Sequence, residues 1–306
     1  MTRLLSIALL ALTTCALWSC SREPASPDQQ PDAVRVVVLS PALASMMRSL
    51  SLDHAIVGRH NYDRWTDTTI PACGDNTALD YEMLLSVRPD VVLIEESAQP
   101  TPGRLLELAG EKGWAVRRVA VLTLSDVRAA FTSTWNAVVR DAGAEPGEPD
   151  ALRAALAEFD EACAPNDDRW PDEGGILIAM PGRTLGVLGP GSYHQELLER
   201  IGGIPAISQG APFISMDAED VAELAPRAIV LIHTAEPGAE PNTRLASDAE
   251  SEALLGAVTR LGVPAVDRGL IAIVDHPLAI VPGADAAAVA RELARAIELI
   301  RERASE

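Results

Sequence analysis

The sequence is short of histidine, aromatic residues and cysteine, and its basic residues are far outnumbered by acidic ones. It has 25 lysines and arginines against 44 aspartates and glutamates, no run of basic residues, and a formal net charge of −19 at pH 7. A surface of that sign repels nucleic acid and anionic membranes, so the composition argues against a nucleic-acid-binding function. The 48% share of hydrophobic residues in 306 predicts a folded protein with room for two lobes.

Several motifs that mark enzymes are also missing. The sequence has no G-x-S-x-G elbow, no glycine-rich dinucleotide fingerprint and no H-E-x-x-H, and no Gly-Lys-Ser/Thr follows the GPGSYHQ stretch. No two histidines share a helical ligand spacing, so we expect no metal site built by the protein alone. They stand at positions 54, 60, 194, 233 and 276, the first of them expected to be structural. A Ser, His and Asp set brought together only in space stays open, which keeps a two-lobed α/β transferase or hydrolase as an alternative.

The first twenty residues are MTRLLSIALLALTTCALWSC. Arg3 precedes an apolar stretch over residues 4–17, which is too short for a comfortable membrane span and has the proportions of a secretory signal. The stretch runs into Leu17-Trp18-Ser19-Cys20. This ending resembles the bacterial lipobox, in which the cysteine becomes the lipidated first residue of the mature protein. Plain secretion with an incidental cysteine is the alternative.

We therefore expect a lipoprotein signal peptide over residues 1–19, lipid attachment at Cys20 and a polar tether over residues 20–33. The protein would be exported and anchored to the bacterial membrane, facing the periplasm or the cell exterior. Cys73 and Cys163 are the remaining cysteines of such a mature chain. In an oxidising compartment they either form a disulfide or stay as two separate buried thiols, and both arrangements remain open.

Short apolar β-branched runs alternate with helical patterns in two blocks of the sequence. Residues 34–124 start with VRVVVLS and predict an N-terminal α/β lobe with a mostly parallel sheet. Residues 125–148 predict a connecting helix and linker, in which the apolar residues of LSDVRAAFTSTWNAVV fall on one face. The alternation restarts at GILIAM, so residues 149–306 predict a C-terminal α/β lobe.

One short pattern occurs twice, 137 positions apart. LDYEMLLSVRPDVVLI over residues 79–94 aligns with MDAEDVAELAPRAIVL over residues 216–231. The matched pairs are Asp80 with Asp217, Glu82 with Glu219, and Pro89 with Pro226. A motif that occurs twice at this separation favours two lobes over one large domain.

In their order and spacing these segments resemble the periplasmic substrate-binding proteins of ABC importers for iron–siderophore complexes, haem and cobalamin. RVVVLSPALASMMRSL resembles the opening strand and helix, IVGRHNYD resembles the entry to the ligand loop, and the two repeated stretches resemble the most diagnostic segments of the lobes. The resemblance runs from about Arg35 to the C-terminus. It implies the class III fold, in which two Rossmann-like lobes with mostly parallel sheets are joined by a single long backbone helix.

The resemblance also implies a function. The chain would be a monomeric solute-binding protein without an intrinsic cofactor, which captures a metal chelate between its lobes and delivers it to an ABC permease dimer. Glu82 and Glu219 hold the positions of the carboxylates that meet arginine pockets on the two permease subunits. Alternatively, both glutamates only favour the dipole of the helix whose first turn they occupy. A lipoprotein that senses a ligand without a transporter is a further alternative.

Loops at the carboxyl ends of the strands are expected to line the cleft. By resemblance, Tyr62 and Phe213 match ligand-contacting aromatics of cobalamin binders, although Tyr62 packed under its own loop stays open. Asn76 stands where that family has another aromatic, which weakens a direct cobalamin assignment. The further candidates for ligand contact are His60, Trp65, Tyr193, His194 and His276.

Replacing Cys20 by alanine removes the side chain expected to carry the lipid. The variant should therefore move from the membrane fraction to the soluble fraction, as measured by cell fractionation and immunoblotting. Cys73→Ala is the matched control and should leave the protein with the membrane. A Cys20→Ala protein that still partitions like the wild type would place the anchor elsewhere.

Overall fold

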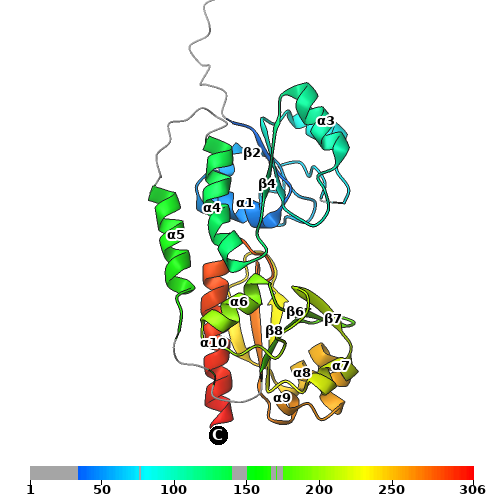
Figure 1. The fold of residues 1–306 in the computed structure, drawn as a ribbon, viewed down its shortest axis with the longest axis vertical. Coiled ribbons are helices and arrows are strands. Elements are labelled where there is room, and N and C mark those ends of the chain that lie inside the picture. The colour runs from blue at the N-terminus through cyan, green and yellow to red at the C-terminus, as the bar shows by residue number, and fades with distance from the viewer. Residues whose placement is uncertain (1–33, 76, 140–149, 167–169, 171–174) are drawn as a thin grey trace, which may run out of the picture. The chain divides into compact units, whose positions relative to one another are not determined.

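Two β-sheets with helices packed around them organise the chain (Figure 1). The computed structural model describes residues 34–306 apart from residues 76, 140–149, 167–169 and 171–174. The expected signal peptide, lipidation site and tether, Asn76 and most of the linker lie outside these residues.

The N-terminal lobe is a four-stranded sheet in the order β2-β1-β3-β4, with every neighbouring pair parallel. Val36, Val37 and Val38 are fully buried, as expected for a strand covered on both faces. Ser40 then caps the first helix by accepting a hydrogen bond from the Leu43 amide. The elements are β1 (Val36–Val38), α1 (Pro41–Ser49), the 3₁₀ helix η1 (Asp53–Ala55), β2 (Ile56–Gly58), α2 (Tyr81–Val87), β3 (Val91–Glu95), α3 (Gly103–Lys112) and β4 (Ala115–Val119).

The C-terminal lobe is a six-stranded sheet in the order β7-β6-β5-β8-β10-β9. Strands β5, β8 and β10 are parallel, whereas β6, β7 and β9 run antiparallel to their neighbours. The antiparallel strands were not predicted. Strand β6 pairs antiparallel with β5 because the four residues between them are too few for a parallel crossover. The elements are β5 (Ile176–Met180), β6 (Leu185–Leu188), α6 (Tyr193–Arg200), β7 (Phe213–Met216), α7 (Ala218–Leu224), β8 (Ala228–Thr234), β9 (Asn242–Leu245), α8 (Asp248–Leu255), η2 (Gly256–Arg260), α9 (Pro264–Asp267), β10 (Ile271–His276) and α10 (Ala286–Ala304).

Two helices, α4 (Leu124–Val139) and α5 (Asp150–Ala162), lie between the sheets in the chain. Helix α4 packs against α1 of the N-terminal lobe and against α6 of the C-terminal lobe, so it contacts both. Helix α5 lies beside α4 and packs on α10 (Figure 1). Helix α4 is thus the backbone helix between the lobes, and α5 packs beside it, with Phe131 of α4 and Phe159 of α5 meeting edge to face at 6.2 Å.

A single apolar cluster runs through both lobes. It includes Val36 and Leu93 of the first sheet, Phe131 and Phe159 of the helix pair, and Leu293 of α10, each at most 3% exposed. Fully burying one such side chain contributes about 1.5–3 kcal/mol relative to exposure. Residues 34–306 accordingly form one compact unit, because separating the lobes would expose this shared core.

The lobes also approach closely at one polar contact. The Ser45 hydroxyl on α1 accepts a hydrogen bond from the Ala284 amide at 2.8 Å and donates one to the Ala42 carbonyl at 2.8 Å. A Cβ atom on Gly283 would lie 2.1 Å from the Ser45 Oγ, so only glycine fits there. This contact fixes α1 against the loop that follows β10.

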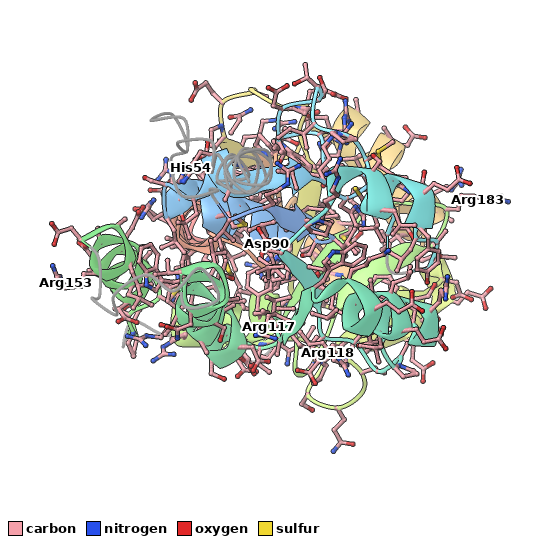
Figure 2. All side chains as sticks on the ribbon, turned by 90° about the horizontal axis from the view of Figure 1, so that it is seen from above. His54, Asp90, Arg117, Arg118, Arg153 and Arg183 are labelled. Atoms are coloured by element: carbon pink, nitrogen blue, oxygen red, sulfur yellow. The ribbon has the colours of Figure 1, made fainter. Side chains whose placement is uncertain are left out.

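Two polar side chains lie over the N-terminal lobe in the view from above (Figure 2). His54 is exposed, and its Nδ1 lies 3.1 Å from the Ser51 carbonyl, in keeping with the structural role expected of it. Asp90 accepts a hydrogen bond from the Arg35 amide at 2.8 Å and so ties the starts of β1 and β3 together.

Candidate functional site

The loops that follow the strands of the two sheets face each other. Arg64 after β2 forms an ion pair of 2.5 Å with Glu236 after β8. The Tyr193 amide donates to the carbonyl of Leu122, which follows β4, at 2.9 Å. The carboxyl edges of parallel sheets are where α/β proteins bind ligands, so the space between the lobes is the candidate site.

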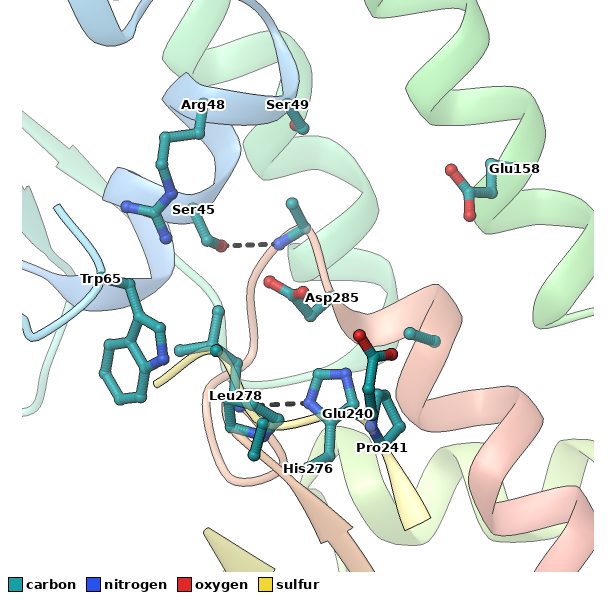
Figure 3. A pocket seen from close by; sticks show the side chains of 15 residues that line it. Ser45, Arg48, Ser49, Trp65, Glu158, Glu240, Pro241, His276, Leu278 and Asp285 are labelled. Carbon is teal, nitrogen blue, oxygen red and sulfur yellow. Dashed lines mark hydrogen bonds between the residues drawn. The ribbon is translucent and has the colours of Figure 1, made fainter. Parts of the chain in front are cut away.

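A cavity of about 630 Å³ lies between these loops (Figure 3). Helix α1 and the loop of Trp65 form one wall, and the loops after β8 and β10 with the start of α10 form the other. Its volume is in the range of small-molecule sites. Of the seven residues predicted to contact a ligand, the cavity includes Trp65 and His276.

Trp65 is held in place by polar contacts of its own loop. The buried Asp63 carboxylate accepts hydrogen bonds from the Trp65 amide at 3.0 Å and the Thr66 amide at 3.1 Å. The Arg59 guanidinium donates to the carbonyls of Ile70 and Asp63 and closes the loop. The indole Nε1 of Trp65 is buried without a hydrogen-bond partner among the described residues. Such a donor costs about 1–3 kcal/mol until it meets an acceptor.

His276 ends β10 and is 5% exposed. Its Nδ1 accepts a hydrogen bond from the Leu278 amide at 3.1 Å, so in the neutral ring the proton is on Nε2. Burial lowers the pKa of His276, and the nearby Asp285 and Glu292 offset this only in part. The imidazole is therefore a neutral donor, and Figure 3 shows its second nitrogen turned toward the cavity.

Charges are distributed unevenly around the cavity. Arg48 is the one arginine or lysine among the described lining residues, and it donates to Thr66 Oγ1 at 2.9 Å. Glu158, Glu240 and Asp285 are the acidic ones. Figure 3 shows Asp285 and Glu240 on the side where His276 lies, with Arg48 and Trp65 across from them.

Of three further predicted residues, Tyr62 and Phe213 are on the surface and His60 is half-buried. Tyr62 is 71% exposed, its amide donates to His60 Nδ1 at 3.1 Å, and the two rings lie 5.7 Å apart. It does not pack under its own loop. Phe213 is 56% exposed, and a Cβ on Gly186 would lie 2.8 Å from its ring. These three side chains are not among the residues that line the cavity.

Tyr193 and His194 lie elsewhere than expected. Both are 3% exposed, and the Ala279 carbonyl accepts from the Tyr193 hydroxyl at 3.2 Å and from His194 Nε2 at 2.8 Å. At this helix start the Gln195 amide donates to the Ser192 cap at 3.3 Å. These side chains support the core, and we leave them out of the candidate site.

Sequence reasoning missed Glu95 at the end of β3. Its carboxylate accepts a hydrogen bond from the Ser40 hydroxyl at 2.9 Å, and burial raises its pKa. A small cavity of about 30 Å³ beside it is also lined by Arg118. The available signal was a carboxylate directly after a buried strand, at the edge where ligands bind.

The repeated pattern is also a repeat of backbone conformation. Helices α2 and α7 each have seven residues, and Asp80 and Asp217 cap them by accepting from backbone amides. Each helix ends in a left-handed residue before its proline, Arg88 with φ 44° and Ala225 with φ 48°. Glu82 and Glu219 are exposed in the first turns of these matching frames.

Cys73 and Cys163 are separate buried thiols, and burial raises the pKa of each to about 11. Across the described residues, no three histidine, cysteine or acidic side chains are grouped to hold a metal ion. Within the same part of the chain, no helix has the length and apolar character needed to cross a membrane.

No protein-family model matches the chain, and no curated protein matches it in sequence. Solved structures do match its fold. The periplasmic haem-binding protein BhuT, in complex with two haems, aligns over 86% of this chain and 98% of its own at 21% identity, with a TM-score of 0.62. The haem-binding protein HutB of Vibrio cholerae aligns over 89% and 98% at 15% identity, with a TM-score of 0.64. The vitamin-B12-binding protein BtuF of Vibrio cholerae aligns over 88% and 98% at 12% identity, with a TM-score of 0.63.

These identities are low, so the comparisons establish the fold. The two-lobed α/β architecture predicted from the sequence is confirmed, and it is the architecture of periplasmic haem- and B12-binding proteins. The matched proteins are binding proteins rather than enzymes.

The buried His194 makes stability depend on pH. Burial lowers the pKa of His194 from 6.5 to about 4. The imidazole is therefore protonated below about pH 6.5 in the unfolded chain, but only below about pH 4 in the folded chain. Stability should therefore fall as pH drops through this window, by about 2 kcal/mol at pH 5. His194→Gln keeps a donor for Ala279 and removes the titration. Urea unfolding at pH 7.5 and 5.0 should show a smaller loss in the variant, and equal losses would contradict this account.

Proposed function

We propose that this protein is the lipid-anchored solute-binding component of an ABC importer. It captures a metal chelate of the iron–siderophore, haem or cobalamin kind between its lobes and delivers it to a permease dimer. The supporting observation is the cavity of about 630 Å³ between the facing loops, in a fold shared with haem- and B12-binding proteins. Under this proposal the chain acts as a monomer and carries no cofactor of its own, and Cys20 supplies the anchor.

The ligand contacts we propose combine the cavity with aromatic side chains that lie outside its lining. Trp65 offers a buried donor without a partner among the described residues, and the second ring nitrogen of His276 is turned toward the cavity (Figure 3). Tyr62, His60 and Phe213 offer ring surface on loops and strand starts. A large exposed apolar ring on a soluble protein is often functional, because its burial against a ligand gains the area that folding left in water.

Glu82 and Glu219 are the proposed permease contacts. Both are exposed, and each occupies the first turn of a helix with the same length, cap and left-handed end. A partner built from two like subunits presents the same binding pocket twice, and the two matching helices present one exposed glutamate to each pocket. Arginine pairs with such carboxylates through charge-assisted, geometrically specific hydrogen bonds.

The enzyme alternative rests on the exposed pair of His233 and Asp275 at the ends of β8 and β10, with 2.6 Å between Nδ1 and Oδ1. Among the described residues no hydroxyl or thiol hydrogen-bonds this histidine, and Asp275 also pairs with Arg244. The arrangement lacks the nucleophile that a hydrolytic triad needs. The cavity lining includes one tryptophan, Trp65, and one arginine, Arg48, which is in keeping with the proposed receptor.

Changing Tyr62 and Phe213 to alanine should weaken ligand binding at least tenfold. The reason is the loss of ring contacts worth on the order of 1 kcal/mol each beyond buried area. The measurement is titration with haem, a ferric trihydroxamate, a ferric tricatecholate and cobalamin, followed by tryptophan fluorescence. Leu106→Ala with Leu261→Ala removes comparable exposed apolar groups and should leave affinity unchanged. Failure of every chelate to bind the wild type would refute the proposed function.

Changing Glu82 and Glu219 to glutamine should abolish transport and leave ligand affinity intact. A first-turn carboxylate adds only about 0.3–1 kcal/mol to folding through the helix dipole, whereas truncating one side of a buried Arg–carboxylate pair costs about 2–5 kcal/mol. Binding to the permease in proteoliposomes and ligand uptake are the measurements. Glu111→Gln with Glu252→Gln changes one exposed helical glutamate in each lobe and should transport normally. Normal uptake by the Glu82 and Glu219 variant would contradict a docking role, and the repeated pattern would then serve only to stabilise the starts of the two helices.

A further inference from the structure

The cavity between the lobes has an acidic side without internal partners. Asp285 precedes α10 at the cap position, yet its carboxylate makes no capping hydrogen bond. Glu240 in the loop after β8 has no ion pair or hydrogen bond among the described residues. Glu158 differs, because Arg291 donates to it at 2.9 Å. Two carboxylates that border the cavity are therefore available to a ligand.

Arg48, the one arginine or lysine among the described lining residues, does not pair with them. The Arg48 guanidinium donates to Thr66 Oγ1, and that hydroxyl donates to the buried Asp63 carboxylate. This chain of contacts holds Arg48 on the N-terminal wall of the cavity, across from Asp285 and Glu240 (Figure 3). The two carboxylates thus have no cationic partner among the described lining residues, in a protein whose net charge of −19 already attracts cations.

An independent observation indicates that a ligand fills this space. His276 is 5% exposed, and its Nε2–H turns into the cavity with no hydrogen-bond partner among the described residues. The buried Nε1–H of Trp65 likewise has no partner in the described part of the chain. Buried donors are almost always satisfied in folded proteins, so the Trp65 Nε1–H calls for an acceptor oxygen from outside the chain. The Nε2–H of His276 is a second donor available on the same cavity.

We propose that the cavity binds a ligand that carries an ammonium group beside acceptor oxygens. The ammonium lies against Asp285 and Glu240, and carbonyl-type oxygens accept from Trp65 Nε1 and His276 Nε2. This inference rests on the proposed function and narrows it to metal chelates with a positively charged arm. Anionic chelates, such as haem with its two propionates or a tricatecholate complex, would bring like charge against the two carboxylates and are disfavoured.

A matched pair of probes isolates the charge. One is a linear ferric trihydroxamate that ends in a free ammonium, and the other is the same chelate with that nitrogen acetylated. Titration of the purified full mature protein at low salt should show at least tenfold tighter binding of the ammonium form. Asp285→Asn with Glu240→Gln should bring the ratio of the two affinities close to one. Asp248→Asn with Glu252→Gln, two exposed carboxylates elsewhere on the C-terminal lobe, should leave the ratio unchanged.

The donors are tested separately from the charge. Trp65→Phe keeps the ring area and removes Nε1–H, so it should weaken both probes by a similar factor and preserve their ratio. If Trp65→Phe removed the preference for the ammonium probe over the acetylated one, the charge selectivity could not be assigned to the two carboxylates alone.

The outcomes separate the inference from the proposed function. Equal binding of the two ferric probes, or tighter binding of haem or the tricatecholate, would overturn the ammonium site and leave a metal-chelate receptor standing. A metal-free trihydroxamate completes the set. If its ammonium form binds as tightly as the ferric one, with the same dependence on Asp285 and Glu240, the cation site stands and the metal-chelate function falls. If no form of the probe binds, the inference falls.

Discussion

The close approach of Ser45 to Gly283 and Ala284 is the constraint on which the geometry between the lobes depends. The Ser45 hydroxyl accepts from the Ala284 amide, and a Cβ on Gly283 would lie 2.1 Å from that hydroxyl oxygen. The loop after β10 can therefore rest on α1 only without a side chain at that position. Asp285 is the next residue along the chain, so the contact that joins the lobes also sets where one acidic group of the cavity stands. His276 begins the same loop, held by its own bond to the Leu278 amide.

The apolar cluster shared by the lobes gives this contact its rigidity. Phe131 and Phe159 pack between the two sheets, and α10 continues the same core. Opening the lobes would expose that apolar surface at a cost of about 25 cal/mol per Å². An exposed ion pair between the lobes, such as Arg64–Glu236, contributes only about 0–1 kcal/mol, so the shared core contributes far more to holding the lobes together. A cavity between two lobes that share a core is largely preformed, and a preformed site spends less binding energy on ordering its own side chains.

The sequence predicted what local pattern controls. Buried β-branched runs predicted the parallel strands, and helical periodicity predicted α4. The spacing of Asp80 and Asp217 from their prolines predicted two helices of one design. Short antiparallel strands were missed because four residues carry little periodicity. Tyr193 and His194 were misplaced because a loop-to-helix junction does not reveal which way its first side chains point, and the Ala279 carbonyl that binds them is more than 80 residues away. Asp285 and Glu240 come from loops 45 positions apart, so only the fold brings them to one cavity.

Helices α2 and α7 repeat one local structure in the two lobes, whereas the two walls of the cavity differ from each other. Helices α2 and α7 both end in a non-glycine residue with left-handed backbone, Arg88 and Ala225. This conformation costs a non-glycine residue about 1–2 kcal/mol. Such agreement is what two like docking pockets on a proposed permease dimer would require. The cavity shows no such symmetry, because Arg48 and Trp65 stand on the N-terminal wall and Asp285 and Glu240 on the other. A ligand with a positive arm can then enter in one orientation only, since reversal would place its charge beside Arg48 and leave both carboxylates unpaired.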